Sequence, residues 1–139
     1  DLAPLRTLAA APISMTAHIR YTAWDAHNPA TQSPFVIGEI IRRRIGFAGL
    51  LLTDDLDMEA LSGTVPERAA RSLAAGCDLA LNCWAKMPDM VGIAQACPTM
   101  AEATAARLAA ALARTGALAP DPARRDALAA KRDRLLALA

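Results

Sequence analysis

Aromatic residues are scarce in this 139-residue chain, making up only 4% of the sequence. Rows of aromatic side chains are the platforms on which single-stranded nucleic acids stack, so a protein of that class is not expected. The formal net charge is only +1, which argues against a nucleic acid or an anionic membrane as a partner attracted by bulk charge. No apolar run approaches the roughly 18–20 residues that cross a bilayer.

Cysteines are also few, and their number is odd: Cys77, Cys83 and Cys97. No C-x-x-C spacing occurs, so the pattern favours neither a disulfide framework nor a zinc site. We expect all three to be small core residues in a reducing compartment. No charged leader with an apolar stretch marks a signal peptide, and the chain starts at Asp1 rather than Met, so we expect further residues upstream.

Apolar residues are plentiful, at 54%, which suits one domain with a substantial core. Segments of strand and helix character alternate along the chain, and this order predicts parallel β/α units. The expected strands are Pro12–Ile19, Gly49–Asp55 and Cys77–Asn82. The expected helices are 35–45, Pro66–Ala75, Thr99–Ala113 and a last one from Asp121 through Arg134, with Gly46, Gly76 and Gly116 as stops.

Three carboxylates follow the second expected strand: Asp54, Asp55 and Asp57. The uninterrupted leucines before them suit a strand covered on both faces, as in a parallel sheet. Ligands of parallel β/α folds bind at the carboxyl ends of the strands, so these acids are candidate site residues. Strand alternation puts Asp54 on the side of Leu50 and Leu52 and Asp55 on the opposite side. We expect Asp55 and Asp57 to hydrogen-bond loop backbone or to cap the next segment of the chain.

The segment IGFAGLLLTDDLDMEAL, residues 45–61, resembles the nucleophile strand of glycoside hydrolase family 3. The similarity is greatest to the cytoplasmic bacterial β-N-acetylhexosaminidases that recycle cell wall, and it covers roughly residues 1–85. Residues 86–139 resemble the more variable helical end of such enzymes. Four further segments match in order: DLAPLR at 1–6, MTAHIRYTAWD at 15–25, PATQSPFVI at 29–37 and AAGCDLALNC at 74–83.

This resemblance implies a fold: the C-terminal portion, about three β/α units, of a (β/α)₈ barrel, which typically takes about 250 residues. The whole chain, residues 1–139, would be a fragment of a single catalytic domain. Asp54, which follows Thr53 at the strand end, would be the nucleophile of a retaining double displacement. The family's acid/base motif D-x-H and its sugar-binding K-H-x-P-G-H-G strand belong upstream of the TAHI segment, so we expect this chain alone to be inactive.

The resemblance also implies a substrate and a setting. The parent enzyme would remove terminal, non-reducing β-linked N-acetylglucosamine from muropeptide-type fragments in the cytoplasm, without a metal or a cofactor. Its partners would be that small carbohydrate and the missing N-terminal half of the barrel. His18, at the end of the first expected strand, would either line the pocket or be a packed, hydrogen-bonded side chain.

Asp25-Ala26-His27 has the D-x-H spacing, and a histidine can act as an acid or base near neutral pH. It follows the TAHI segment, however, where the family does not carry its catalytic histidine. We therefore interpret the match as coincidental.

Two hypotheses from other classes stay open at this point. The chain could be a degenerate or non-catalytic module that binds a sugar or a partner, because no proton donor is in view. It could also be a receiver-like signalling domain, in which an acid pair likewise follows an apolar strand. The phosphoacceptor of a receiver would fall at Cys83, which has no carboxylate, so this second hypothesis is remote.

Overall fold

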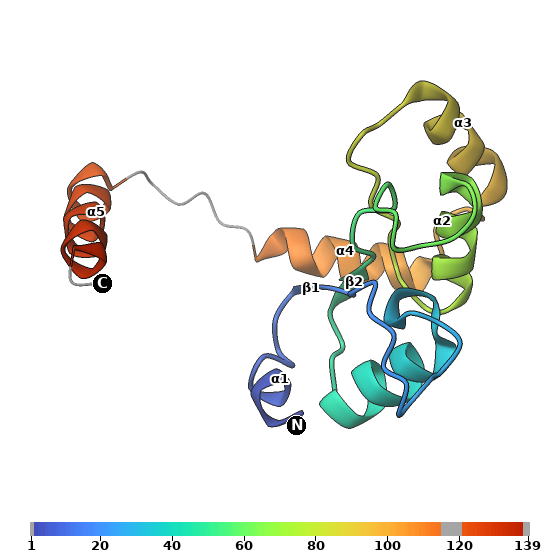
Figure 1. Cartoon of the computed structure of the whole chain (residues 1–139), viewed down its shortest axis with the longest axis horizontal. Helices are drawn as coiled ribbons and strands as arrows, with labels where there is room; N and C mark the ends of the chain where they lie inside the picture. The colour runs from blue at the N-terminus through green and yellow to red at the C-terminus, as the bar shows by residue number, and fades with distance from the viewer. Residues whose placement is uncertain (1, 115–120, 138–139) are drawn as a thin grey trace.

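The computed structural model describes residues 2–114 and 121–137, in which short strands alternate with helices (Figure 1). The strands are β1 (Ile13–Met15) and β2 (Leu50–Leu52). The helical elements are α1 (Ala3–Thr7), the 3-10 turn η1 (Ala30–Gln32), the π-helix η2 (Val36–Ile45), α2 (Val65–Ala74), α3 (Met87–Ala96), α4 (Glu102–Ala113) and α5 (Pro122–Leu136). The expected α/β class is confirmed.

The two strands form a parallel pair in which Ile13 lies opposite Leu50 and Met15 opposite Leu52. The ladder continues one residue further, because the Thr16 amide donates to the Leu52 carbonyl over 2.9 Å. Leu50 and its neighbour Leu51 are each 1% exposed, so β2 is covered on both faces, as its unbroken leucines predict. Both strands are shorter than the sequence suggests.

The third strand expected at Cys77–Asn82 is wrong as a strand, because only Leu79 pairs, through one parallel bridge to Leu52. Beyond that bridge a side chain replaces the backbone ladder: the Leu81 amide donates to Thr53 Oγ1 over 2.8 Å. The segment still runs beside β2, but as an irregular chain.

Helix η2 differs from the expected α-helix in having the wider i→i+5 pattern. It ends as expected at Gly46, whose φ of 84° is left-handed, and the Phe47 amide donates back to the Ile41 carbonyl. In a helix this wide, the residues four and five positions after Glu39 both lie beside its side chain. The Glu39 carboxylate accordingly accepts hydrogen bonds from Arg43 and Arg44. The expected apolar face is confirmed: Val36, Ile37 and Ile40 are buried and Ile41 packs beside them.

Helix α2 begins with a capping box between Thr64 and Glu67 and is followed by Gly76, as expected, at φ 113°. Helices α1 and α3 are absent from the sequence-based prediction. Neither contains a fully buried residue, although Ile93 of α3 packs on the core cluster of Leu56, Leu61 and Ala69. Helix α3 packs closely on α2: a Cβ on Gly92 would lie 2.5 Å from Pro66 Cγ.

The open side of β1 borders an apolar hollow of about 570 Å³, lined by side chains of α1, β1 and η2. On this side Ile13 is 42% and Met15 51% exposed. Within the described residues β1 pairs only with β2, so one edge of the sheet carries unpaired backbone groups. An unpaired apolar edge of this kind is a surface that another strand could cover.

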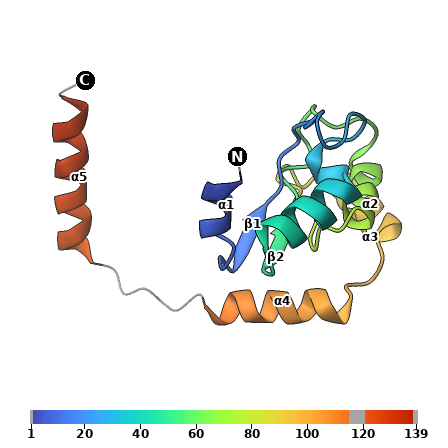
Figure 2. The same cartoon turned by 90° about the horizontal axis from the view of Figure 1, so that it is seen from below.

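Helix α4 packs against β2, whereas α5 stands apart from the other elements (Figure 2). The start of α5 agrees with the sequence, because the Asp121 carboxylate accepts the Arg124 amide at 2.9 Å. Gly116, the expected stop of the preceding helix, lies outside the described residues. No helix within residues 2–114 or 121–137 combines the length and the apolarity required to traverse a bilayer.

Candidate active site

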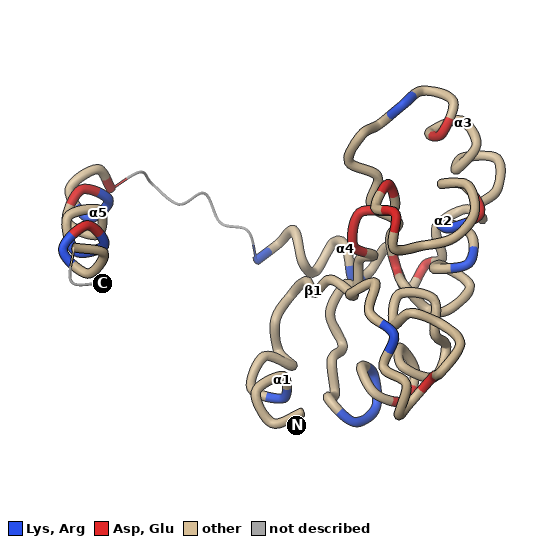
Figure 3. Tube along the Cα trace, viewed as in Figure 1, with Lys and Arg blue, Asp and Glu red and all other residues tan. Residues whose placement is uncertain are grey.

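Asp54 lies two residues beyond β2, at the carboxyl end of that strand, in a segment of the chain that is rich in acidic residues (Figure 3). It is partly buried, and one carboxylate oxygen accepts the Asp55 amide at 2.8 Å. Among the described residues, its other oxygen has no hydrogen-bond partner. Thr53 before it is fully buried and holds the strand end in place through its bond from Leu81. The site thus presents one carboxylate with a free oxygen on a fixed backbone.

Unlike Asp54, both Asp55 and Asp57 accept hydrogen bonds from the loop at residues 82–86. Asp55 Oδ1 accepts the amides of Asp57 and Cys83, each at 3.1 Å. Asp57 Oδ2 accepts the Trp84 amide at 3.0 Å. Partial burial alone would raise the pKa of Asp55, but the amides of Cys83 and Asp57 outweigh it and hold that pKa below its usual value. The expectation that these two acids bind loop backbone is confirmed.

His18 follows β1 and connects three segments of the fold. Its Nε2 lies 2.9 Å from the Asp55 carbonyl oxygen, and its Nδ1 lies 2.7 Å from Thr31 Oγ1. A carbonyl only accepts, so Nε2 carries the proton. Thr31 Oγ1 also accepts from Thr16 Oγ1 at 2.9 Å. Both ring nitrogens are therefore used to hold the ends of the strands together.

The Asp25-Ala26-His27 match is a turn held by its own carboxylate. Asp25 accepts the Ser33 hydroxyl at 2.7 Å and the amides of His27 and Asn28 at 2.9 Å each. These hydrogen bonds, the one from Ser33 foremost, hold the pKa of Asp25 well below its usual range. Asp25 thus contacts the backbone of His27, and it orders the loop that leads into η2.

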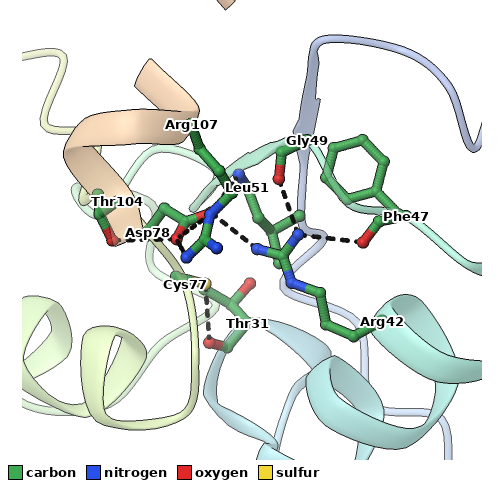
Figure 4. A network of polar contacts seen from close by, with 9 residues as sticks. All are labelled: Thr31, Arg42, Phe47, Gly49, Leu51, Cys77, Asp78, Thr104 and Arg107. Carbon is green, nitrogen blue, oxygen red and sulfur yellow. Dashed lines mark hydrogen bonds and ion pairs between the residues drawn. The ribbon is translucent and has the colours of Figure 1, made fainter. Parts of the chain in front are cut away.

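A buried carboxylate that sequence reasoning missed, Asp78, lies where η2, β2 and α4 meet (Figure 4). Asp78 Oδ2 accepts Arg42 Nη2 at 2.7 Å and the Leu51 amide at 2.9 Å. Its Oδ1 accepts Arg107 Nε at 3.0 Å and the Thr104 hydroxyl at 3.2 Å. Burial would raise the pKa of Asp78, but these bonds and the two arginine charges keep it below the usual value.

The three cysteines are free thiols in different environments. Cys77 is buried, as expected, and burial raises its pKa to about 12. Cys97 is half-buried, and Cys83 is exposed, so the expectation of three core cysteines is wrong. Cys83 lies on the loop that Asp55 binds, where partial desolvation and the nearby Asp55 charge raise its pKa. The nearby acid charge thus disfavours the thiolate form of Cys83.

Within the described residues, no group of three or more His, Cys, Asp and Glu side chains is arranged to hold a metal ion. Asp55 and Asp57, in the loop after β2, are instead bound to backbone amides.

The sequence profile of the glycosyl hydrolase family 3 N-terminal domain matches residues 1–117. The chain belongs to glycoside hydrolase family 3. The match spans the segment from α1 through α4, and with it the two strands, the acids after β2 and the Asp78 network of this family 3 chain.

Curated relatives of this family 3 chain carry the name β-hexosaminidase. The one from Alkalilimnicola ehrlichii is 45% identical over 87 residues, covering 60% of this chain and 25% of the relative. The one from Neisseria meningitidis serogroup C is 41% identical over 95 residues, covering 66% of this chain and 26% of the relative. The chain thus spans about a quarter of the length of these relatives.

Two solved structures share the fold of this chain. A β-N-acetylglucosaminidase from Paenibacillus sp. str. FPU-7 is 26% identical with a TM-score of 0.70, covering 87% of this chain and 27% of that one. A β-N-acetylglucosaminidase from Thermotoga maritima is 28% identical with a TM-score of 0.61, covering 75% and 25%.

Proposed function

We propose that this chain is the C-terminal part of the catalytic barrel of a retaining β-N-acetylhexosaminidase. Residues 1–85 would supply the β/α units that carry the nucleophile, and residues 86–139 the helical end. Membership in family 3, the parallel pairing of β1 with β2 and the names of the relatives support this assignment. The relatives are about four times as long as the matched segment, which leaves room in them for the rest of a (β/α)₈ barrel.

The single observation that carries the proposal is the contrast among the three acids after β2. Asp55 and Asp57 bind the amides of a neighbouring loop, whereas Asp54 keeps one oxygen without a partner in the described chain. A retaining glycosidase needs such an ionised oxygen to attack the anomeric carbon and form a glycosyl-enzyme. Water then releases the sugar with retained configuration. We assign this role to Asp54.

The proton donor would come from the missing part of the barrel. His18 is a poor candidate for it, because both of its ring nitrogens already bind Thr31 and Asp55. His18 would instead line the base of the pocket and hold the Asp55 backbone beside the nucleophile. The exposed edge of β1 and the apolar hollow next to it give the missing strand and helix a surface to cover.

The names of the relatives support N-acetylglucosamine as the released sugar. We propose muropeptide-type fragments in the cytoplasm as the natural substrates, as the sequence resemblance implies. The parent protein would act by double displacement, with no metal or cofactor in the reaction.

A hybrid enzyme tests the proposal. The upstream part of the Alkalilimnicola ehrlichii relative, up to the start of the match, is joined to residues 1–139 of this chain and assayed on a chromogenic β-N-acetylglucosaminide. We expect no turnover by the 139-residue chain alone and clear turnover by the hybrid. Asp54→Asn should lower kcat of the hybrid on the order of 10³-fold or more, because the amide keeps the shape but cannot attack.

The matched control is Asp126→Asn, which alters an exposed acid on α5 that pairs with Arg125 and should leave kcat unchanged. A 5-fluoro glycosyl fluoride that traps the glycosyl-enzyme should place its sugar on the peptide that contains Asp54, as read by mass spectrometry. A sugar on any other residue, or full activity of Asp54→Asn, would overturn the assignment. Turnover by the chain alone would show that its own residues supply the proton donor.

A further inference from the structure

His18 connects the segment after β1 to the backbone beside the proposed nucleophile. Its Nε2 donates to the Asp55 carbonyl over 2.9 Å, although the two residues are 37 positions apart in the chain. The Asp55 amide donates in turn to one carboxylate oxygen of Asp54 at 2.8 Å. His18 is therefore two hydrogen bonds away from Asp54, and Asp55 is the single residue between them.

The backbone and the side chain of Asp55 are both engaged. Its carboxylate accepts the amides of Asp57 and Cys83, each at 3.1 Å. Its carbonyl, which has two lone pairs, accepts the Met58 amide at 3.2 Å as well as His18 Nε2. Met58 belongs to the same loop as Asp55, whereas His18 comes from the segment after the neighbouring strand. The bond from His18 thus ties the Asp55 carbonyl to a different part of the fold.

Two hydroxyl groups determine which ring nitrogen of His18 carries the proton. Because Nε2 faces a carbonyl and must donate, Nδ1 of the neutral ring must accept. Its partner at 2.7 Å is Thr31 Oγ1, whose only proton is then used in this bond. Thr16 Oγ1, which lies 2.9 Å from Thr31 Oγ1, must therefore donate to it. The donors run in one direction, from the end of β1 to the Asp55 carbonyl.

Both hydroxyl groups lie in the protein interior, since Thr31 is 0% and Thr16 5% exposed. A buried hydroxyl that loses its partner costs about 1–3 kcal/mol, so a ring turned away from Thr31 is disfavoured. Thr16 is held by its amide, which donates to the Leu52 carbonyl. Thr31 is held by its carbonyl, which accepts the Cys77 thiol at 3.7 Å (Figure 4). The two hydroxyl groups are thus anchored on the sheet, and they fix the ring that they orient.

We propose that His18 is a positioning residue for Asp54 and acts through Asp55. Held in one tautomer by the hydroxyls of Thr16 and Thr31, the ring fixes the Asp55 peptide. The Asp55 amide then holds one oxygen of Asp54 and leaves the other oriented to attack. A displacement on the order of 1 Å at a reacting group can cost about 100-fold in rate. The inference rests on the proposed function of Asp54 and adds what orients its carboxylate.

The 139-residue chain gives the first test, because it contains only two histidines, His18 and His27. Nitrogen-15 NMR of the neutral imidazole rings, assigned by the signals that His27→Gln removes, should show His18 with a protonated Nε2 and an unprotonated Nδ1. A His18 ring with its proton on Nδ1, or with both tautomers populated, would overturn the proposal.

Amide hydrogen exchange separates a local role from a general loss of stability. His18→Asn shortens the side chain so that it no longer reaches the Asp55 carbonyl. Exchange of the Asp55 amide should become about tenfold faster, as expected for the loss of one local hydrogen bond. The Leu51 amide, which donates to Asp78 at 2.9 Å, should change much less. Equal acceleration at Asp55 and Leu51 would show only a weakened fold and would overturn the positioning role.

Thr31→Val tests the hydroxyl groups, because it keeps the shape of a buried side chain and removes the donor to His18. It should also speed exchange of the Asp55 amide, but less than His18→Asn does, since the ring keeps its bond to the carbonyl. An Asp55 amide that exchanges at the wild-type rate in Thr31→Val would overturn the role given to the hydroxyl groups.

The hybrid enzyme tests the consequence for the reaction. His18→Asn should lower kcat about 10- to 100-fold and leave KM within about twofold, because only the orientation of the attacking oxygen is lost. His18→Gln should restore most of kcat, since its amide nitrogen can occupy the place of Nε2 and donate to the Asp55 carbonyl. Unchanged kcat in His18→Asn, or equal losses in His18→Asn and His18→Gln, would overturn the proposal.

His27→Gln is the matched control. His27 is an exposed histidine whose backbone amide donates to Asp25, and the variant keeps that amide. Its kcat and KM should equal those of the unaltered hybrid. A fall in kcat as large as that of His18→Asn would overturn a role specific to His18.

These measurements keep the inference distinct from the proposed function. If the tautomer and the exchange rates agree with the positioning role but no hybrid turns over, the hold on Asp54 is supported and only the proposed reaction fails. If the hybrid turns over but exchange at Asp55 is unchanged in His18→Asn, the inference fails and the assignment of the nucleophile stands.

Discussion

Asp78 shows how one side chain can connect distant parts of this fold. Its two oxygens take donors from η2, β2 and α4, which lie 26 to 36 residues away along the chain. Its side chain is 3% exposed, and both partner guanidinium groups reach in from more open positions. A buried carboxylate is tolerated only with such complete pairing. The network therefore holds the sheet to its flanking helices.

We expect Asp78→Asn to lower the free energy of unfolding by about 3 kcal/mol, because it leaves two guanidinium groups without their counter-charge. The folded-state pKa of Asp78 lies below that of the unfolded chain, about 3.9. Its stabilisation is therefore complete above that pH and is lost as the pH falls through the folded-state pKa.

Urea unfolding at neutral pH and at steps below pH 4 would measure both effects. The wild-type chain should lose stability in that acid range by more than Asp78→Asn does. Asp126→Asn, which alters a 68% exposed acid that pairs with Arg125, should change the free energy of unfolding by less than about 0.5 kcal/mol. If Asp78→Asn and Asp126→Asn lowered the free energy of unfolding by equal amounts, a structural role for Asp78 would be contradicted.

Sequence reasoning could single out Asp54 but not Asp78, and the difference is physical. Asp54 follows an apolar strand in a segment whose residues resemble those of a known family. Asp78 lies in an apolar stretch like any strand residue, and its partners Arg42 and Arg107 are defined only by the tertiary fold. The helix dipole explains a run of arginines at the end of η2, but it gives no sign that Arg42 turns inward to a carboxylate.

At the scale of elements, two glycines have opposite surroundings: Gly49 lies in a tight contact between strand segments, and Gly38 lies on an open helix surface. A Cβ on Gly49, just before β2, would lie 2.6 Å from the Ala11 carbonyl oxygen and 2.7 Å from that of Pro12. A Cβ on Gly38 in η2 would meet no heavy atom within 4 Å. The segments that lead into β1 and into β2 can approach this closely only because residue 49 has no side chain.

We expect Gly49→Ala to destabilise the chain by about 1–3 kcal/mol, because backbone must move to admit the methyl group. Gly38→Ala should stabilise it by about 0.5–1 kcal/mol, since it adds helix propensity without a clash. Thermal unfolding followed by circular dichroism would show opposite shifts in melting temperature. Shifts of the same sign in both variants would contradict the packing described at Gly49.

The order of strands and helices was predictable because apolar runs, caps and glycine stops are local signals. The missing third strand was not, because Thr53 and Asp78 replace backbone partners with side chains, which no periodicity reveals. Helix α3 was missed although Ile93 packs on the cluster of Leu56, Leu61 and Ala69, because its close approach to α2 is made at Gly92, which carries no side chain to mark a face.

At the scale of the whole molecule, α5 contributes little to the fold. It contains no buried residue and stands apart from the other elements (Figures 1 and 2). We expect a chain that ends at Arg114, whose guanidinium binds the Ala10 carbonyl, to keep its melting temperature within about 2 °C, because stability follows buried contacts. Circular dichroism should show less helix and an unchanged midpoint. A fall of several degrees would show that α5 docks on the rest of the protein.

The open edge of β1 is the other feature of this scale, because within the described residues β1 pairs only with β2. The strand is encoded by local residues, but the pairing of its second edge is a tertiary contact that no local pattern reveals. Two of its large apolar side chains, Ile13 and Met15, are 42% and 51% exposed. A chain with such an edge is expected to associate with other strands at high concentration.

The binding of the 82–86 loop by Asp55 and Asp57 has a consequence for engineering this fold. A designer who wished to vary the surface beside these acids would exchange the loop that carries Trp84. That loop takes its shape from two carboxylates that lie almost thirty positions earlier, so a graft without them would lose its anchors. The transferable unit is the pair of loops, and Asp54, to which we assign the role of nucleophile, lies between the two anchors and the strand.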